Sequence, residues 1–390
     1  MITRFPLQLL EKSATPCYLY DLGLLRDTLT EICRLSDRPD WRVHYAVKAN
    51  ANPEILAEIR RAGLGIDAVS GGEIALCLDA GFKAEDIVFA GVGKSDEEIL
   101  LALRAGIGSF NVESVEELHV ISELASRENL TASVALRVNP NIDAHTHKYI
   151  TTGLAENKFG IDMDRLDETV DTALSLPGIK LNGLHFHIGS QITITKPFEL
   201  LCTTIRQVLS QMAVKGVNIR SINVGGGLGV DYADPDAHPI ADFESYFKVF
   251  ADNLPLQPGQ TLHFELGRSI VAQCGSLISR CLYVKHGVSK DFVILDAGFS
   301  ELIRPALYQA YHRIDNLSAL GEHRPKHSYD VVGPICESSD CFGEEVALPE
   351  TRRGDLFAIR SAGAYGESMS SHYNCRHLRP TVYIGAVEAE

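Results

Sequence analysis

Between about residue 43 and residue 270 the sequence alternates between short apolar runs and longer amphipathic stretches. Three of the amphipathic stretches (54–63, 73–81 and 97–106) end in glycine, which readily adopts the left-handed conformation at a helix C-terminus. Eight strand–helix pairs in about 250 residues are typical of a (β/α)8 TIM-type barrel. A doubly wound sheet is the second interpretation, because it would contain fewer strands than the eight that the sequence indicates. The expected strands begin near Val43, Ile66, Ile87, Ser109, Ser133, Gly183, Ser221 and Leu262.

The pattern changes after about residue 275. Glycine, proline and aspartate, instead of long helices, now separate β-like segments, which lie at 282–288, 291–298, 329–336, 356–363 and 381–387. The strand-like run 16–21 precedes the barrel, and we expect it to pair into this second region. We therefore predict an α/β chain with a barrel over 25–272. Residues 1–24 and 273–390 should form a mainly β domain of the β-sandwich or β-barrel type, which completes the substrate site.

The net charge of −15 disfavours nucleic acid and anionic membranes as partners, because an acidic surface repels phosphate groups. No stretch approaches about 18 consecutive apolar residues, the length of a membrane-spanning helix. The first residues lack the apolar region of a signal peptide, so we expect a cytoplasmic protein. The nine cysteines include no CxxC pair, which favours reduced thiols over a metal site or a dithiol redox centre.

Lys48 ends the first barrel strand, in the run HYAVKANANPEI. Burial lowers the pKa of an amine, and an amine of lowered pKa readily forms a Schiff base with a carbonyl cofactor. The plainer interpretation is a lysine whose stem is buried and whose amine reaches solvent. Lys48 by itself favours the plainer interpretation.

A run of glycines, Gly225–Gly229, follows the seventh predicted strand. Backbone N–H groups in such a turn can point at a phosphate, and barrels commonly bind phosphate after strands seven and eight. The run is also consistent with a tight turn that binds nothing.

Polar residues also follow the sixth and eighth predicted strands. After the eighth, Glu265 suits a protonated ring nitrogen of a cofactor, and Arg268 suits a phosphate or carboxylate. The alternative is an ion pair between them at the barrel mouth. After the sixth, His187 suits stacking on a flat cofactor and Ser190 suits donation to a phosphate, although His187 is equally consistent with a core histidine.

Three motifs lie in the predicted β domain: RPALY (304–308), CESSD (336–340) and GAYGESMSSHYN (363–374). Each combines reactive or charged residues with glycine, proline or serine, which suits a site built on loops. Cys336 beside Glu337 is consistent with a proton donor and equally with a small buried thiol.

These motifs, taken in order, resemble the fold-type III pyridoxal-phosphate decarboxylases, and among them most closely the diaminopimelate decarboxylases. The resemblance covers nearly the whole chain and agrees with the predicted barrel. It implies pyridoxal 5'-phosphate as cofactor, an amino acid as substrate and a homodimer. The implied reaction converts meso-2,6-diaminopimelate to L-lysine and carbon dioxide, the last step of lysine biosynthesis. The matching motifs are YAVKAN, DAVSGGE, GVGKSDEEI, FNVES, LRVNP, HTHKYITTGLAENKFGI, HFHIGSQ, GGGLG, ELGRS, IRPALY, GPICESSD and GAYG.

The resemblance also implies a role for each matching residue. Lys48 would hold the cofactor covalently, His187 would stack on its ring and Glu265 would face its ring nitrogen. Cys336 would protonate the reacting carbon, and Cys336 and Glu337 would reach the active site of the partner subunit. The cofactor-binding set would be Lys48, His187, Ser190, Gly226, Gly227, Glu265, Gly267, Arg268 and Tyr365. The substrate-binding set would be Arg268, Arg304, Tyr308, Glu337 and Tyr365.

Two positions depart from the family pattern: Leu266 replaces a proline and Ser339 replaces a glycine. Ser339 lies beside the loop that contacts substrate, so a related substrate such as ornithine, lysine or carboxynorspermidine is one alternative. Arg304 argues against simple diamines. A racemase on the same barrel is a second alternative, although Glu265 argues against it. A cofactor-free homologue that binds a partner protein is the third, and it would be expected to lose Lys48, Cys336 or the glycine run.

Overall fold

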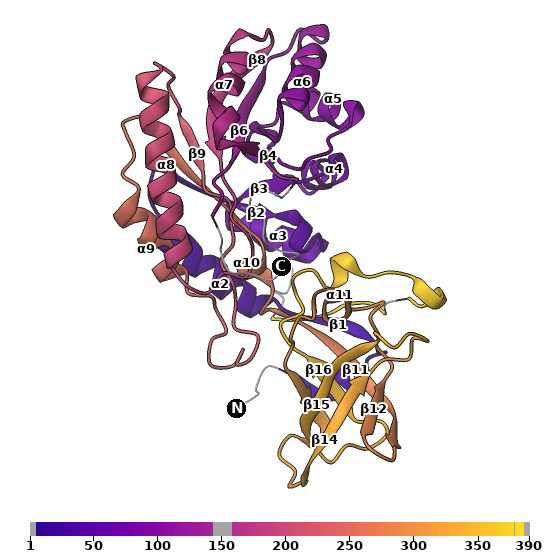
Figure 1. Cartoon of the computed structure of the whole chain (residues 1–390). Coiled ribbons are helices and arrows are strands. Elements are labelled where there is room, and N and C mark those ends of the chain that lie inside the picture. Colours follow the sequence, from indigo (N-terminus) through magenta and orange to yellow (C-terminus); the bar gives the residue numbers. More distant parts are fainter. Residues whose placement is uncertain (1–4, 143–157, 378, 386–390) are drawn as a thin grey trace. The chain divides into compact units, whose positions relative to one another are not determined.

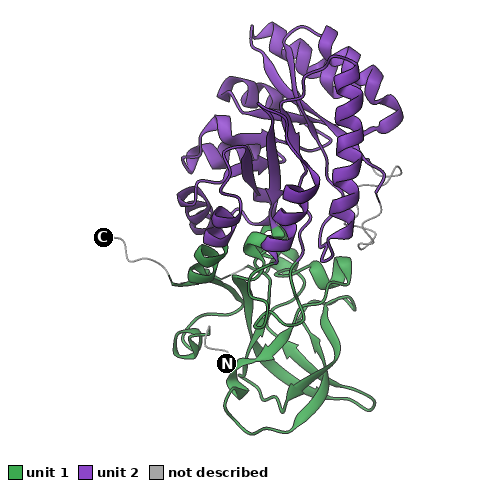
Figure 2. Ribbon diagram, turned by 90° about the vertical axis from the view of Figure 1, so that its left-hand side faces the viewer, with its two compact units in different colours: residues 1–28, 230–241, 268–390 green, residues 29–229, 242–267 purple. Residues whose placement is uncertain are grey.

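The computed structural model describes residues 5–142, 158–377 and 379–385. The chain forms two compact units (Figure 2). The barrel unit comprises residues 29–229 and 242–267, and the β unit comprises residues 1–28, 230–241 and 268–390. The short segment 230–241 therefore belongs to the β unit, although barrel residues precede and follow it.

The barrel unit contains a closed ring of eight parallel strands with helices outside it (Figure 1). The ring closes because β10 pairs with β2 and β5 pairs with β6. The predicted (β/α)8 barrel is confirmed, and each predicted strand overlaps an observed one. The ring strands are β2 (Trp41–Ala46), β3 (Gly65–Ala68), β4 (Ile87–Phe89), β5 (Ser109–Val112), β6 (Ala132–Asn139), β8 (Ile179–His185), β9 (Ser221–Asn223) and β10 (Thr261–Leu266). A short strand, β7 (Ile161–Asp162), pairs with β6 outside the ring.

Side-chain caps begin several of the surrounding helices. Ser95 and Glu98 form a capping box at α5, and Gly106, with φ 72°, ends the same helix. Such caps fix the residue at which the loop after a barrel strand becomes a helix. The helices are α2 (Leu22–Leu35), α3 (Pro53–Arg61), α4 (Gly71–Asp79), α5 (Asp96–Ala105), α6 (Val115–Arg127), α7 (Leu166–Ser175), α8 (Lys196–Val214) and α9 (Phe243–Asn253), with single turns η1 (Val47–Ala49), η2 (Ala84–Asp86) and η3 (Met163–Arg165).

The β unit is built on an eight-stranded mixed sheet in the order β13-β16-β11-β12-β14-β15, with β1 paired to β11 and β17 paired to β1. Strand β1 pairs antiparallel with β11, which confirms the predicted pairing of the run 16–21. The strands are β1 (Cys17–Asp21), β11 (Gly275–His286), β12 (Asp291–Leu295), β13 (Ile314–Asn316), β14 (Lys326–Val332), β15 (Cys341–Pro349), β16 (Leu356–Ile359) and β17 (Val382–Ile384). The helices are α1 (Leu7–Leu10), α10 (Arg268–Val271) and α11 (Arg304–Tyr308), with single turns η4 (Leu317–Ala319), η5 (Glu367–Met369) and η6 (Tyr373–Cys375).

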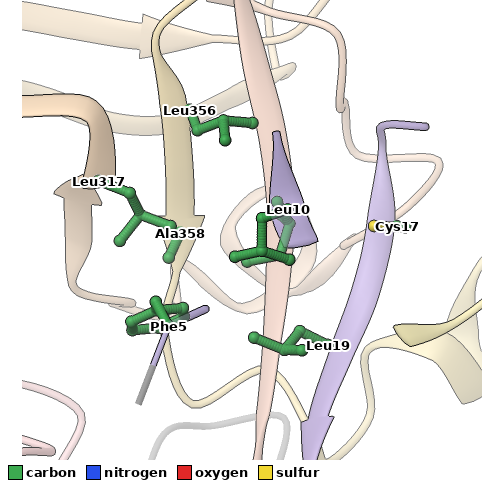
Figure 3. Close-up of a cluster of buried hydrophobic side chains, with 8 residues drawn as sticks. Phe5, Leu10, Cys17, Leu19, Leu317, Leu356 and Ala358 are labelled. Carbon is green, nitrogen blue, oxygen red and sulfur yellow. The ribbon is translucent and has the colours of Figure 1, made fainter. Parts of the chain in front are cut away.

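The N-terminal segment contributes to the core of the β unit (Figure 3). Its apolar side chains pack against residues that lie roughly 260 to 350 positions later in the chain, and burial of this kind contributes about 25 cal/mol per Å² of apolar surface. The cluster comprises Phe5, Leu10, Cys17, Leu19, Ile278, Leu317, Leu356 and Ala358.

No helix among the described residues is long and apolar enough to cross a membrane. Those residues also contain no group of three or more His, Cys, Asp or Glu side chains arranged to hold a metal ion.

Candidate active site

Polar side chains of the barrel unit gather at the carboxyl ends of the strands. Lys48 lies in η1 directly after β2, and Asp67 and Glu265 are the next-to-last residues of β3 and β10. Strands β3 and β10 are the neighbours of β2 in the ring. Three adjacent strands therefore supply an amine and two carboxylates at the end of the barrel where TIM-barrel enzymes carry their active sites.

Lys48 is paired with a buried carboxylate. Its Nζ lies 3.0 Å from Oδ2 of Asp67, whose side chain is only 1% exposed. The Lys48 side chain itself is 42% exposed, which agrees with the plainer interpretation of an amine that reaches solvent. Burial and the charge of Glu265 raise the pKa of Asp67 to about 7, against the opposing effect of Lys48. The other oxygen of Asp67, Oδ1, is buried without a hydrogen-bond partner and can accept from a bound group.

Three buried side chains hold Glu265. Nδ2 of Asn111 and Nδ2 of Asn223 donate to its Oε1 at 2.9 and 2.7 Å, and Nε2 of His185 lies 2.9 Å from its Oε2. Burial acts to raise the pKa of Glu265, but the charge and hydrogen bond of His185 and the charge of Lys48 hold that pKa well below its usual range. Glu265 is therefore ionised, and a carboxylate with three donors still has a lone pair for a fourth.

His187 lies two residues beyond the end of β8. Its Nδ1 accepts a hydrogen bond from the N–H of Gly226 at 3.2 Å, which places the ring proton on Nε2. Burial and the charges of Arg137 and Lys48 lower the pKa of His187 well below its usual range. The ring is therefore neutral at physiological pH, and a flat neutral ring suits stacking on another ring.

The glycine loop packs closely against neighbouring backbone. A Cβ on Gly226 would lie 2.0 Å from the backbone oxygen of Glu265. Gly227 has φ +114°, and its Cβ would lie 2.9 Å from the oxygen of Gly189. Packing against β10 therefore explains part of the need for glycine, and phosphate binding by this loop stays a prediction. Ser190 and Gly267 lie on the loops after β8 and β10.

The remaining predicted residues lie in the β unit. RPALY forms α11, which places Arg304 and Tyr308 four residues apart on one helix face. The guanidinium carbon of Arg268 lies 4.9 Å from the centre of the Tyr365 ring. Tyr365 has φ +57°, an uncommon left-handed conformation for a bulky residue. Strain of this kind is typical of functional sites.

Cys336 and Glu337 lie on the loop between β14 and β15, and both are exposed. The alternative of a buried thiol at Cys336 is therefore wrong. The hydroxyl of Tyr373 donates to Oε1 of Glu337 at 2.9 Å. Asp340 orders the loop, because its carboxylate accepts from the N–H groups of Phe299 and Ile335 at 2.7 Å each.

The two departures from the family pattern do not strain the backbone. Leu266 is buried at the end of β10, and Ser339 is exposed on the Cys336 loop. Neither residue has a positive φ, so the chain does not require glycine at Ser339. Most of the run HTHKYITTGLAENKFGI lies at 143–157, outside the described residues.

Sequence reasoning missed several polar residues that contact the predicted ones. Each lies at or near the carboxyl end of an apolar barrel strand, and that position was a signal available in the sequence. The missed residues are Asp67, Asn111, His185 and Asn223.

The barrel residues fit pyridoxal phosphate. A half-exposed amine at Lys48 is accessible to an aldehyde, and a buried anionic Glu265 suits a protonated pyridine nitrogen. The unpartnered Oδ1 of Asp67 and the neutral ring of His187 add an acceptor and a stacking surface.

Comparison with known proteins identifies similar chains. The pyridoxal binding domain of the pyridoxal-dependent decarboxylases matches residues 30–272. A diaminopimelate decarboxylase of Bacteroides thetaiotaomicron is 55% identical over 375 residues, which are 96% of each chain. The crystal structure of diaminopimelate decarboxylase from Helicobacter pylori complexed with L-lysine has a TM-score of 0.89 at 38% identity, over 97% of this chain and 93% of that one. The corresponding enzyme of M. jannaschii in complex with L-lysine has a TM-score of 0.87 at 34% identity, over 97% and 88%.

Proposed function

This chain belongs to the diaminopimelate decarboxylase family of pyridoxal-dependent decarboxylases, and we propose that it converts meso-2,6-diaminopimelate to L-lysine and carbon dioxide. Two similar structures hold L-lysine, the product of this reaction. The observation in this chain that carries most weight is the buried, ionised Glu265. A racemase of this fold would be expected to place an arginine at that position.

We assign the cofactor to the barrel residues and to two residues of the β unit. Lys48 would hold pyridoxal phosphate covalently, His187 would stack on its ring and Glu265 would pair with its ring nitrogen. Bound pyridoxal phosphate supplies a sink for the electron pair that the departing carboxylate leaves behind. The phosphate and the rest of the cofactor would contact Ser190, Gly226, Gly227, Gly267, Arg268 and Tyr365.

Three barrel side chains favour the anionic form of Glu265. Its two asparagine donors and His185 form charge-assisted hydrogen bonds in a buried environment, where such bonds are strong. These donors are in place before substrate binds, so no reorganisation of the carboxylate is needed during carbon dioxide release.

Residues of the β unit would select the substrate. Arg304 and Tyr308 would bind the carboxylate that is not lost, Glu337 would bind the distal ammonium group, and Arg268 and Tyr365 would also contact the substrate. Ornithine has no second carboxylate, so it would leave Arg304 unpaired. An arginine near its terminal ammonium group would also repel it, and unpaired or like charges are strong sources of discrimination.

Cys336 would donate its thiol proton to the α-carbon from which the carboxylate has left. The exposure of Cys336 and Glu337 supports a role in the active site of a second copy of this chain. The working unit we propose is therefore a homodimer with two shared sites.

The two parts of the chain would have different roles. Residues 25–272 would bind the cofactor, and residues 1–24 and 273–390 would complete the substrate site. The nine free thiols suit a reducing compartment, which supports action in the cytoplasm.

The reaction is tested by measuring carbon dioxide release from meso-diaminopimelate, ornithine, lysine and arginine in parallel, with purified protein and pyridoxal phosphate. Release from meso-diaminopimelate alone, with L-lysine as product, is the expected result. Preference for another substrate would overturn the assignment of Arg304 and Glu337. No release from any of them, with the visible absorbance of the lysine-bound cofactor present, would favour a racemase. Absence of that absorbance would favour a cofactor-free homologue.

A further inference from the structure

Tyr232 lies between two buried guanidinium groups of the β unit, and sequence reasoning gave it no role. We propose that Tyr232 is a positioning residue that holds Arg268 and Arg304 ready to bind one substrate carboxylate together. This inference rests on the proposed function, because it explains how the carboxylate that is not lost is recognised.

Tyr232 contacts both arginines. Nη1 of Arg268 donates to the Tyr232 hydroxyl at 2.7 Å. The guanidinium carbon of Arg304 lies 5.0 Å from the centre of the Tyr232 ring, within the range of a cation–π interaction. Arg268 and Arg304 are only 6% and 5% exposed. One aromatic side chain therefore contacts both cations, with its oxygen accepting from Arg268 and with both its ring and its hydroxyl interacting with Arg304.

Arg304 is otherwise held by a neutral imidazole. Its Nη1 lies 2.8 Å from Nε2 of His312, and Nδ1 of His312 lies 2.8 Å from the carbonyl oxygen of Arg360. Burial and the charge of Arg304 lower the pKa of His312 to about 3, so the ring is neutral. It therefore donates from Nδ1 to Arg360 and accepts from Arg304 at Nε2.

No carboxylate of the described residues lies within 4 Å of the Arg304 guanidinium, which contacts the ring of Tyr232 and the imidazole of His312. A buried cation with neutral neighbours is costly, and an incoming anion removes that cost. The arrangement is therefore prepared for a carboxylate and poorly suited to a ligand without one.

Tyr232 offsets the repulsion between the two cations. Burial and the nearby charge of Arg268 lower the pKa of Arg304, and Tyr232 acts in the opposite direction. The two arginines in turn outweigh the effect of burial on Tyr232 and lower the pKa of its hydroxyl. The Tyr232 hydroxyl and the two cations therefore stabilise one another.

The backbone around Tyr232 is fixed independently of the two arginines. Nε2 of Gln273 donates to the carbonyl oxygens of Asp231 and His238 at 2.9 and 3.1 Å. Nη2 of Arg360 lies 2.8 Å from Oδ1 of Asp236. Because the 230–241 segment is anchored on both sides of Tyr232, the ring is able to orient the arginines instead of following them.

The test compares two ligands that differ by one carboxylate, L-lysine and 1,5-diaminopentane, on the cofactor-loaded protein. Their dissociation constants are read from the change in cofactor absorbance, without turnover. Y232F keeps the ring and loses the hydroxyl, which accepts from Arg268 and also interacts with Arg304. We expect its affinity for L-lysine to fall about tenfold, since a hydrogen bond to a charged group contributes about 1.5 kcal/mol or more. Affinity for 1,5-diaminopentane should stay within about twofold of the wild type.

Steady-state kinetics with meso-diaminopimelate supply a second measurement. We expect Y232F to raise KM about tenfold with kcat within about threefold, because the lost hydrogen bond positions a binding group remote from the reacting carbon. Tyr329→Phe is the matched control, since the Tyr329 hydroxyl lies in the same unit and accepts from the N–H of Thr351 at 3.4 Å. Y329F should leave the ratio of the two ligand affinities unchanged.

Equal losses of affinity for both ligands in Y232F, or no loss for either, would overturn the role of Tyr232. The proposal would also be overturned if the wild type did not bind L-lysine more tightly than 1,5-diaminopentane. Failure of the proposed function is a separate result: the wild type would then release no carbon dioxide from meso-diaminopimelate, whereas the ligand ratio would still decide the role of Tyr232.

Discussion

The amine of Lys48 lies 3.0 Å from one carboxylate oxygen of Asp67, while the other oxygen of Asp67 is buried without a hydrogen-bond partner. The carboxylate of Asp67 therefore gains an ion pair with Lys48, but its burial disfavours the charged form. Buried groups of this kind are typical of sites where function is gained at the expense of stability.

Asp67→Asn should stabilise the cofactor-free protein, and more at pH 8 than at pH 5. The pKa of Asp67 is about 7 in the folded chain against an ordinary value of 3.8, so the folded state holds a proton that the unfolded state releases between these values. The cost of the charged form begins near pH 4, grows as pH rises and is complete above pH 7. The measurement is the melting temperature of D67N and of the wild type at pH 5 and at pH 8. A lower melting temperature for D67N at pH 8, or an equal gain at both pH values, would contradict the argument.

Glu265→Gln should bind pyridoxal phosphate and decarboxylate about 10²-fold more slowly, because an amide cannot remain anionic opposite a protonated ring nitrogen. The cofactor absorbance and kcat are the two measurements. Glu128→Gln is a matched control, since Glu128 pairs with Arg104 on the surface at 2.9 Å. Glu265 would lose its assigned role if E265Q kept the turnover of the control.

Arg304→Met should raise KM for meso-diaminopimelate by about 10²-fold without lowering the melting temperature. The substrate carboxylate would lose its cation, which costs about 2 kcal/mol or more, whereas the free protein would lose a buried cation held by neutral groups. Arg324→Met is the opposite case, because Arg324 lies 2.6 Å from Asp355 and 2.7 Å from Glu322. R324M should lower the melting temperature and leave KM unchanged. The reverse pattern would show that Arg304 is structural.

Much of the fold was readable from sequence because each barrel strand is a local signal. A short apolar run between helical stretches indicates a strand. In TIM barrels the active site lies at the carboxyl ends of the strands, so residues at the end of such a run are candidates for the site. Lys48, His187 and Glu265 were found in this way. The surroundings of Glu265 were not, since Asn111, His185 and Asn223 lie 154, 80 and 42 residues from it in the chain. Only the closed ring brings them together.

The segment 230–241 is a second case in which contacts between residues far apart in the chain could not be predicted. Its run of Asp, Pro and His suggests an ordinary loop between barrel elements, but it clusters with the β unit. Asp234 and Asp236 contact Arg313 and Arg360, which lie some 80 and 124 residues later. Tyr232 was therefore invisible to reasoning about neighbours in sequence, as was the pairing of Lys48 with Asp67.

Mixing two inactive variants should restore activity if Cys336 acts in the partner's site. K48A lacks the cofactor-binding amine and C336A lacks the thiol proton donor. C336A alone should keep the cofactor absorbance and lose about 10²-fold or more in kcat. In a mixed dimer with shared sites, one site has a lesion in both residues, and the other has Lys48 from one subunit and Cys336 from its partner. Random exchange of equal amounts makes half of the dimers mixed, so about a quarter of wild-type activity should return.

The restored activity distinguishes the two arrangements because no site is intact in the mixed dimer if each Cys336 serves its own subunit. Subunits are exchanged by mild dissociation and reassociation, and turnover is compared with that of each variant treated alone. A mixture of K48A with K48A,C336A is the control, since it contains no intact Lys48 in either arrangement. Activity no higher than that of C336A alone, in a sample shown to contain mixed dimers, would place Cys336 in the site of its own subunit or remove it from the mechanism.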